Sequence, residues 1–206
     1  LDGATDQAPQ NADPGLSYIY EHTRGKKCLV LGSGGASVTA VAVLKEMGAN
    51  VVVISRSGAD NYENLDRHED AQMIVNTTPV GMYPEVGKAP VDLRRFPACI
   101  AVADLIYNPA RTALLLQAEE LGIPYAGGLT MLVAQAVRSA ERFLGRSFSA
   151  QTLEKVLHTL RQETENIILI GMPGCGKSKI SAALGKILCR EVVDTDKVVS
   201  HDRQKS

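Results

Sequence analysis

Near its amino end the chain joins two short apolar runs through a glycine-rich segment and one helical stretch. Residues 28–31 (Cys-Leu-Val-Leu) and 51–54 (Val-Val-Val-Ile) are continuous apolar runs, typical of strands buried on both faces. Between them, Gly32-Ser33-Gly34-Gly35 precedes residues 36–47, where apolar side chains recur at helical spacing up to Gly48. This order predicts a βαβ unit with parallel strands and a right-handed crossover.

The same alternation continues along the chain. Residues 73–75 and 100–103 are predicted strands, and residues 111–121 and 129–144 are predicted helices. Alternating elements of this kind favour an α/β fold, specifically a Rossmann-type open parallel sheet with helices on both faces. We expect four parts: a loop-like segment 1–24, a nucleotide-binding domain 25–147, a helical connector 148–165 and a second, partial P-loop α/β unit 166–206.

Composition excludes several classes of protein. Hydrophobic residues make up 45% and charged residues 22% of the 206 residues, and the net charge is −1. These values are ordinary for a globular protein and offer no basic surface for nucleic acid. No apolar run approaches the ~20 residues of a membrane span. The four cysteines form no CxxC pair, a pattern that is typical of a protein in a reducing compartment, so we expect a cytoplasmic protein. The charge balance and the short apolar runs lead us to expect neither a nucleic-acid nor a membrane partner.

The first glycine loop has the chemistry of a pyrophosphate site. A diphosphate needs backbone N–H groups without a Cβ in the way and the positive end of a helix. The residues at this turn meet both needs, with Ser37 replacing the third glycine of the GxGxxG pattern; they are Gly32, Ser33, Gly34, Gly35 and Ala36. A purely structural glycine turn is the alternative.

The end of the second predicted strand indicates which dinucleotide binds. Proteins that bind NAD usually place an acid about 20 residues after the first glycine, to hold the ribose diol. Here the strand ends in Ser55-Arg56-Ser57, and a guanidinium suits a phosphate dianion instead. The sequence therefore predicts NADP(H), with Arg56 on the 2′-phosphate. The alternative is a solvated surface arginine.

A second glycine loop begins near residue 171 and satisfies G-x-x-x-x-G-K-[ST] between a predicted strand, 167–170, and a predicted helix, 177–188. In this motif backbone N–H groups cradle ATP phosphates, the lysine reaches the β and γ phosphates, and the hydroxyl holds Mg²⁺. A further strand, 191–193, leads to Asp194 and Asp196, which can serve a metal and a polyol hydroxyl, or simply cap a helix. The predicted ATP-binding residues are Gly174, Cys175, Gly176, Lys177, Ser178 and Lys179, with Ser178 and Asp194 as metal ligands.

Five ordered segments resemble shikimate dehydrogenase: the first glycine loop, Ser55-Arg56-Ser57, residues 76–82, residues 104–109 with Thr112, and residues 128–135. The resemblance implies NADPH-dependent reduction of 3-dehydroshikimate to shikimate, in a cleft between a substrate domain and this nucleotide domain. It places Ser55 and Ser57 beside Arg56 on the 2′-phosphate. It places Asn76, Thr77, Leu105, Gly128 and Met131 around the nicotinamide half, with Tyr107 and Gln135 facing shikimate.

The sequence departs from that family in the clamp, in the catalytic pair and in one spacing. Ser55 and Ser57 replace the outer members of the family's usual Asn-Arg-Thr clamp. The family's proton-donating lysine belongs to an amino-terminal substrate domain, and its paired Asp lies in an Asn-Thr-Asp segment. Asp13 is our candidate for that Asp, with Thr5-Asp6 and an ordinary loop role as alternatives. Only 19 residues separate Arg56 from Asn76, so part of the sheet is expected to be abbreviated.

The second loop, together with Asp194-Thr195-Asp196, resembles the start of shikimate kinase, which implies Asp196 on shikimate. We therefore expect a piece of a fused shikimate dehydrogenase–shikimate kinase, an enzyme of aromatic amino-acid biosynthesis using NADP(H), ATP and Mg²⁺, with a homodimer as one possible assembly. The piece is expected to be incomplete for both reactions. The rival functions are an NADP-binding sensor without catalysis and a quinate/shikimate dehydrogenase that uses NAD.

Overall fold

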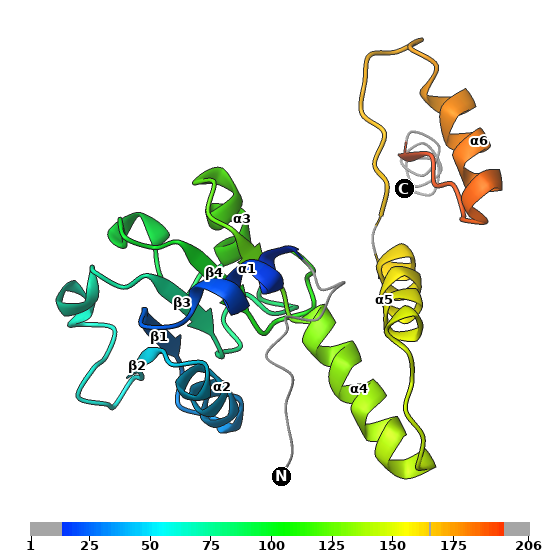
Figure 1. The fold of residues 1–206 in the computed structure, drawn as a ribbon. Helices are drawn as coiled ribbons and strands as arrows, with labels where there is room; N and C mark the ends of the chain where they lie inside the picture. Colours follow the sequence, from blue (N-terminus) through cyan, green and yellow to red (C-terminus); the bar gives the residue numbers. More distant parts are fainter. Residues whose placement is uncertain (1–13, 165, 196–206) are drawn as a thin grey trace. The chain divides into compact units, whose positions relative to one another are not determined.

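The computed structural model describes residues 14–164 and 166–195 (Figure 1). The chain divides into two compact units, one reaching Glu163 and one beginning at Thr164. No helix in the described parts of the chain is long and apolar enough to cross a membrane.

The first unit is built on a five-stranded, fully parallel sheet with the strand order β2-β1-β3-β4-β5. The apolar runs form its centre, and Leu29 is paired with Val52 on one side and Ile74 on the other. The strands are β1 (Lys27–Leu31), β2 (Asn50–Ile54), β3 (Met73–Asn76), β4 (Ala101–Asp104) and β5 (Tyr125–Ala126). The open parallel sheet predicted from the sequence is confirmed.

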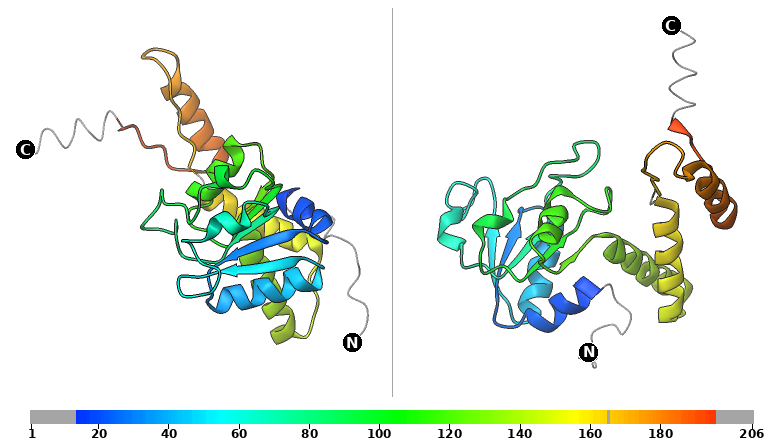
Figure 2. Two further views of the ribbon diagram at one scale, coloured as in Figure 1. Left: turned by 90° about the vertical axis from the view of Figure 1, so that its left-hand side faces the viewer. Right: turned by 90° about the horizontal axis from the view of Figure 1, so that it is seen from above.

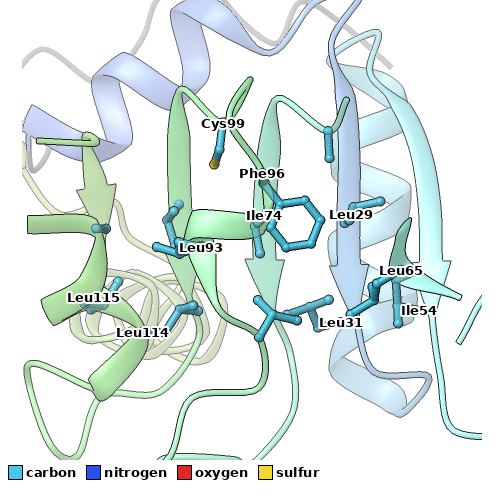
Figure 3. Close-up of a cluster of buried hydrophobic side chains, with 14 residues drawn as sticks. Leu29, Leu31, Ile54, Leu65, Ile74, Leu93, Phe96, Cys99, Leu114 and Leu115 are labelled. Carbon is cyan, nitrogen blue, oxygen red and sulfur yellow. The ribbon is translucent and has the colours of Figure 1, made fainter. Parts of the chain in front are cut away.

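Alternate residues of β1 point to opposite faces of the sheet, and each face carries its own apolar core. On one face, Leu29 and Leu31 pack with Phe96 and with side chains of α3 (Ala113–Glu120), as Figure 3 shows. This face is also covered by the short 3₁₀ helices η1 (Leu65–His68) and η2 (Leu93–Arg95).

On the other face, Cys28 and Val30 pack against α1 (Pro14–His22) and α2 (Gly35–Glu46). The right-hand view of Figure 2 shows these two helices on one side of the strands and α3 on the other. Two further helices, α4 (Leu129–Leu144) and α5 (Ala150–Thr164), complete the first unit.

Two elements of the first unit escape the sequence patterns. Residues before 25 are predicted to be loop-like, yet α1 forms there and packs along β4 and β5. The strand β5 has only two residues, too few for any periodic pattern to register. Between β2 and β3 the crossover holds η1 and no α-helix, in agreement with the short spacing from Arg56 to Asn76.

In the second unit the prediction of two strands is wrong. Helix α6 forms over Lys177–Leu188 as expected, but residues 167–170 and 191–193 are not strands. A strand exists only through hydrogen bonds to a neighbouring strand, and among the described residues neither segment has one. Ile168 and Ile170 are accordingly 78% and 91% exposed.

Candidate functional site

The first glycine loop leaves the carboxyl end of β1 and enters α2. Gly32 has φ +106°, which favours glycine, and its N–H donates to the carbonyl of Ile54 at 2.8 Å. Gly34 is the N-cap of α2 and supplies no side-chain cap, so the first N–H groups of the helix have no side-chain partner there.

The space in front of this turn is open. A Cβ built at Gly34 or Gly35 would meet no protein atom within 4 Å. Packing inside the protein therefore does not explain why these positions lack side chains, whereas close approach of a ligand to the backbone does. Ser37 is buried, and its Oγ donates to the Gly34 carbonyl at 2.7 Å, which holds the turn against the helix.

The strand order places this turn at the topological switch point of the sheet. Chain connections leave β1 toward β2 on one side and β3 toward β4 on the other. In open α/β sheets the ligand crevice lies at such a point, outside the carboxyl ends of the strands. Both the N–H and the Oγ1 of Thr77 donate to the Leu31 carbonyl, at 3.0 and 2.6 Å. The glycine loop and the segment that follows β3 therefore lie side by side.

A buried polar network joins the ends of β3 and β4 to the start of α3. Asn76 is fully buried; its Nδ2 donates to Asp104 Oδ1 at 3.0 Å, and its Oδ1 accepts from the N–H and hydroxyl of Thr78. Asp104 also accepts from the Ile106 N–H and, at 2.7 Å, from the hydroxyl of Thr112, the N-cap of α3.

Burial raises the pKa of Asp104, and these three donors oppose the rise. Most of the hydrogen-bonding capacity of Asn76 is thus spent within the protein, where it sets the course of the chain beside the crevice. Its predicted contact with the nicotinamide half stays a prediction. The sequence patterns did not anticipate these roles of Asp104 and Thr112. The predicted helix over 111–121 includes Thr112, whereas α3 begins at Ala113 with Thr112 as its N-cap.

The predicted 2′-phosphate clamp follows β2. Ser55 is buried, whereas Arg56 and Ser57 are exposed. Among the described residues Arg56 makes no ion pair. Half-burial raises the pKa of Tyr62, and the positive charge of Arg56 partly opposes that rise, so the guanidinium lies within electrostatic range of the phenol.

The residues predicted to surround the nicotinamide half are partly brought together. The Leu105 N–H donates to the Asn76 carbonyl at 3.0 Å, and the Gly128 N–H donates to the Ile106 carbonyl at 3.0 Å. A Cβ at Gly128 would lie 2.1 Å from the Leu105 carbonyl oxygen, so these two backbones touch. Met131 is exposed in the first turn of α4, which starts directly after Gly128.

The two residues predicted to face substrate are both at the surface. Tyr107 is 50% exposed in the segment after β4, and Gln135 is exposed on α4. Asp13, the catalytic candidate, and its alternative Thr5-Asp6 lie outside the described residues.

The second glycine loop turns directly into α6. Gly174 and Gly176 have φ of +79° and +89°, and α6 begins at Lys177. The Nζ of Lys177 donates to the carbonyls of Gly171 and Met172 at 2.6 and 2.9 Å, so the lysine folds back over its own loop.

The remaining residues of this second site are only partly described. Ser178 and Lys179 are exposed in the first turn of α6, Asp194 is half-buried, and Asp196 lies outside the described residues. Within the described ranges no three or more His, Cys, Asp or Glu side chains gather as a metal site.

A parallel sheet with a glycine turn at its switch point defines a Rossmann-type α/β fold. In sequence, about two thirds of the chain is similar to shikimate dehydrogenases. It is 33% identical over 150 residues to the NADP(+) enzyme of Shouchella clausii, covering 65% of this chain and 54% of that protein. With the Caldicellulosiruptor bescii enzyme the identity is 37% over 135 residues, covering 56% and 47%. The chain thus spans about half the length of these curated relatives.

Solved structures agree with the sequence comparison. A chorismate mutase/shikimate 5-dehydrogenase fusion protein from Clostridium acetobutylicum matches with a TM-score of 0.68 and 31% identity, over 73% of this chain and 60% of that one. Shikimate 5-dehydrogenase from Thermus thermophilus, in complex with NADP(H) and shikimate, matches with a TM-score of 0.59 and 27% identity, over 71% and 60%. No protein-family model matches the chain. These relatives are dehydrogenases and lend no support to a kinase part.

Proposed function

We propose that this chain is the nucleotide-binding part of an NADP-dependent shikimate dehydrogenase, which reduces 3-dehydroshikimate to shikimate. The observation that carries the proposal concerns Arg56, which makes no ion pair with any described residue and follows β2, the strand beside the one that leads into the glycine turn. The guanidinium is suited to the 2′-phosphate, the feature that distinguishes NADP(H) from NAD(H). The similarity to dehydrogenases named for NADP(+) supports the same choice.

Each residue set then has a defined task. The backbone N–H groups of Gly34, Gly35 and Ala36 bind the pyrophosphate at the start of α2. Arg56 binds the 2′-phosphate between the hydroxyls of Ser55 and Ser57. The bound cofactor supplies the hydride. The nicotinamide half lies against Asn76, Thr77, Leu105, Gly128 and Met131, and Tyr107 and Gln135 orient the substrate.

The test is a comparison of NADP⁺ and NAD⁺ binding by isothermal titration calorimetry, before and after Arg56→Ala. Loss of charge-assisted hydrogen bonds costs about 1.5–3 kcal/mol, so NADP⁺ affinity should fall roughly 10- to 150-fold. NAD⁺ affinity should stay within about twofold, because NAD⁺ has no group at that position.

The matched control is Arg142→Ala, since Arg142 is another exposed arginine, in the last turn of α4. This control should leave both affinities unchanged. Equal losses for NADP⁺ and NAD⁺ in Arg56→Ala would contradict the assignment, because they would mean that Arg56 supports the fold or the pyrophosphate rather than the 2′-phosphate.

We further propose that the second unit is the start of a shikimate kinase and binds ATP phosphates. Gly174, Cys175, Gly176, Lys177, Ser178 and Lys179 would form the cradle, with Ser178 and Asp194 toward Mg²⁺ and Asp196 toward shikimate. The geometry of the loop supports this: two glycines with positive φ precede a helix, and the Lys177 ammonium lies over the loop carbonyls, where a phosphate can draw it away.

Calorimetric titration of Mg²⁺·ADP into the chain tests this second proposal. Lys177→Ala should abolish the heat of binding, and Lys186→Ala, which changes an exposed lysine in the last turn of the same helix, should not. Absence of Mg²⁺·ADP binding to the unaltered chain would overturn the proposal.

A further inference from the structure

The loop that carries Arg56 is held by its own polar side chains. The Ser55 N–H donates to the Asp60 carbonyl at 3.1 Å, and the Asn61 side chain donates to the Gly58 carbonyl at 3.3 Å. The Asn64 Oδ1 accepts from the Asn61 N–H at 2.9 Å. A Cβ at Gly58 would lie 2.6 Å from Ser55 Oγ, so the loop folds tightly on itself. Its conformation is therefore specified rather than free to vary.

His68 anchors the side chain of Asp60 from outside this loop. Its Nε2 lies 2.9 Å from Asp60 Oδ1, and the imidazole is 10% exposed against 39% for the carboxylate. A carboxylate oxygen only accepts, so Nε2 carries the proton and donates. The other ring nitrogen, Nδ1, is buried and has no hydrogen-bond partner among the described residues. Within the described part of the chain, the bond to Asp60 is thus the only hydrogen bond of the ring.

The direction of the Asp60 carboxylate matters for the charge around Arg56. Asp60 follows Arg56 by four residues, and the bond from the Ser55 N–H to the Asp60 carbonyl brings the two ends of this short stretch together. The Asp60 carboxylate bonds to His68, and the described part of the chain contains no ion pair to Arg56.

Turned toward Arg56, the Asp60 carboxylate would have two effects. It would neutralise the cation and repel a phosphate dianion. It would also present the acceptor that dinucleotide-binding folds use for the ribose diol of NAD.

We propose that His68 is a positioning residue that keeps the Asp60 carboxylate turned away from Arg56, so that the His68–Asp60 pair sets the preference for a 2′-phosphorylated dinucleotide. This inference rests on the proposed NADP-dependent function. It assigns cofactor specificity to a residue buried beneath the loop, twelve positions after the arginine that contacts the ligand.

The experiment compares NADP⁺ and NAD⁺ affinities by calorimetry in four variants of the chain. His68→Phe keeps an aromatic ring in the buried site but removes the donor. We expect NADP⁺ affinity to fall about tenfold, while NAD⁺ affinity is unchanged or rises. Asp60→Ala should keep the NADP⁺ affinity. The double variant His68→Phe/Asp60→Ala should recover it to within about twofold of Asp60→Ala, since no carboxylate remains to be misplaced.

The fourth variant, Arg56→Ala, separates this inference from the proposed function. If it leaves NADP⁺ affinity unchanged, the proposed function itself fails. If it lowers NADP⁺ affinity while His68→Phe does not, only the positioning role fails. Equal loss of both cofactors in His68→Phe, or a double variant as weak as His68→Phe, would also overturn the positioning role, because His68 would then act on the loop as a whole. Thermal unfolding monitored by circular dichroism confirms that each variant is folded.

Discussion

Replacing Thr112 by valine tests whether the buried network beside the crevice is built around an ionised carboxylate. The substitution nearly preserves shape and removes only the hydroxyl. That hydroxyl donates to Asp104 Oδ2 at 2.7 Å and accepts from the Leu115 N–H at 3.3 Å. One change therefore deletes a buried charge-assisted hydrogen bond and the N-cap of α3.

The expected cost is the sum of these two losses. A hydrogen bond to a charged group contributes about 1.5–3 kcal/mol. An N-cap contributes about 1 kcal/mol. The hydrogen bond from the Leu115 N–H to the Thr112 hydroxyl is long, so we take the lower end of the usual range for an N-cap. Together they predict a loss of about 2–4 kcal/mol in the free energy of unfolding, which for a unit of this size lowers Tm by roughly 5–15 °C.

Urea unfolding followed by circular dichroism measures this loss, with Thr130→Val as the control. Thr130 is also buried near the start of a helix, but no hydrogen bond of its hydroxyl is among those described. The control should cost less than about 1 kcal/mol. The Thr112→Val penalty should also shrink at acidic pH, because a protonated Asp104 no longer needs that donor. Equal costs for the two variants, or a penalty independent of pH, would refute an ionised carboxylate at this position.

Three further predictions concern single positions. Gly34→Ser should leave stability unchanged or slightly raised, because Gly34 has an extended backbone at an N-cap, where serine is preferred. Calorimetry should nevertheless show weakened NADP⁺ binding, because the new Cβ occupies the space proposed for the ligand. Burial raises the Asp104 pKa above its unfolded value of about 3.9, so stability falls as pH rises through the folded pKa. Asp104→Asn should remove that loss, measured by urea unfolding at a series of pH values above about 4. Gly15→Ala places a Cβ 1.7 Å from the Tyr125 carbonyl oxygen and should cost at least about 1–3 kcal/mol in thermal unfolding, as α1 is pushed off β5.

The candidate site joins groups that differ in how far local sequence anticipates them. The glycine turn and the Arg56 segment each lie within a few residues of a strand end, so apolar runs and turn residues locate them. The contact between Asp60 and His68 follows no such pattern, because the residues between them do not predict which carboxylate the imidazole contacts. The same holds for Asn76 and Asp104, which are 28 residues apart and meet only because β3 and β4 are neighbours.

In the second unit the local pattern is present, but the two strands that it predicts do not form. Residues 167–170 have the same apolar character as residues 28–31, yet only the latter form a strand. Backbone N–H and C=O groups in an extended segment are satisfied by a neighbour, and β1 has β2 and β3 on its two sides. Apolar composition measures the tendency to be buried, and it does not supply the neighbour.

Local sequence alone determined the βαβ start, the glycine turn that opens α2, and the arginine that follows β2, because apolar periodicity, backbone freedom and side-chain charge act over a few residues. Tertiary structure decided the strand order that brings the turns after β1 and β3 together, the burial that raises the pKa of Asp104, and the turning of Asp60 toward His68. Each of these depends on which distant segments become neighbours, and that is settled by packing the whole sheet and its two cores.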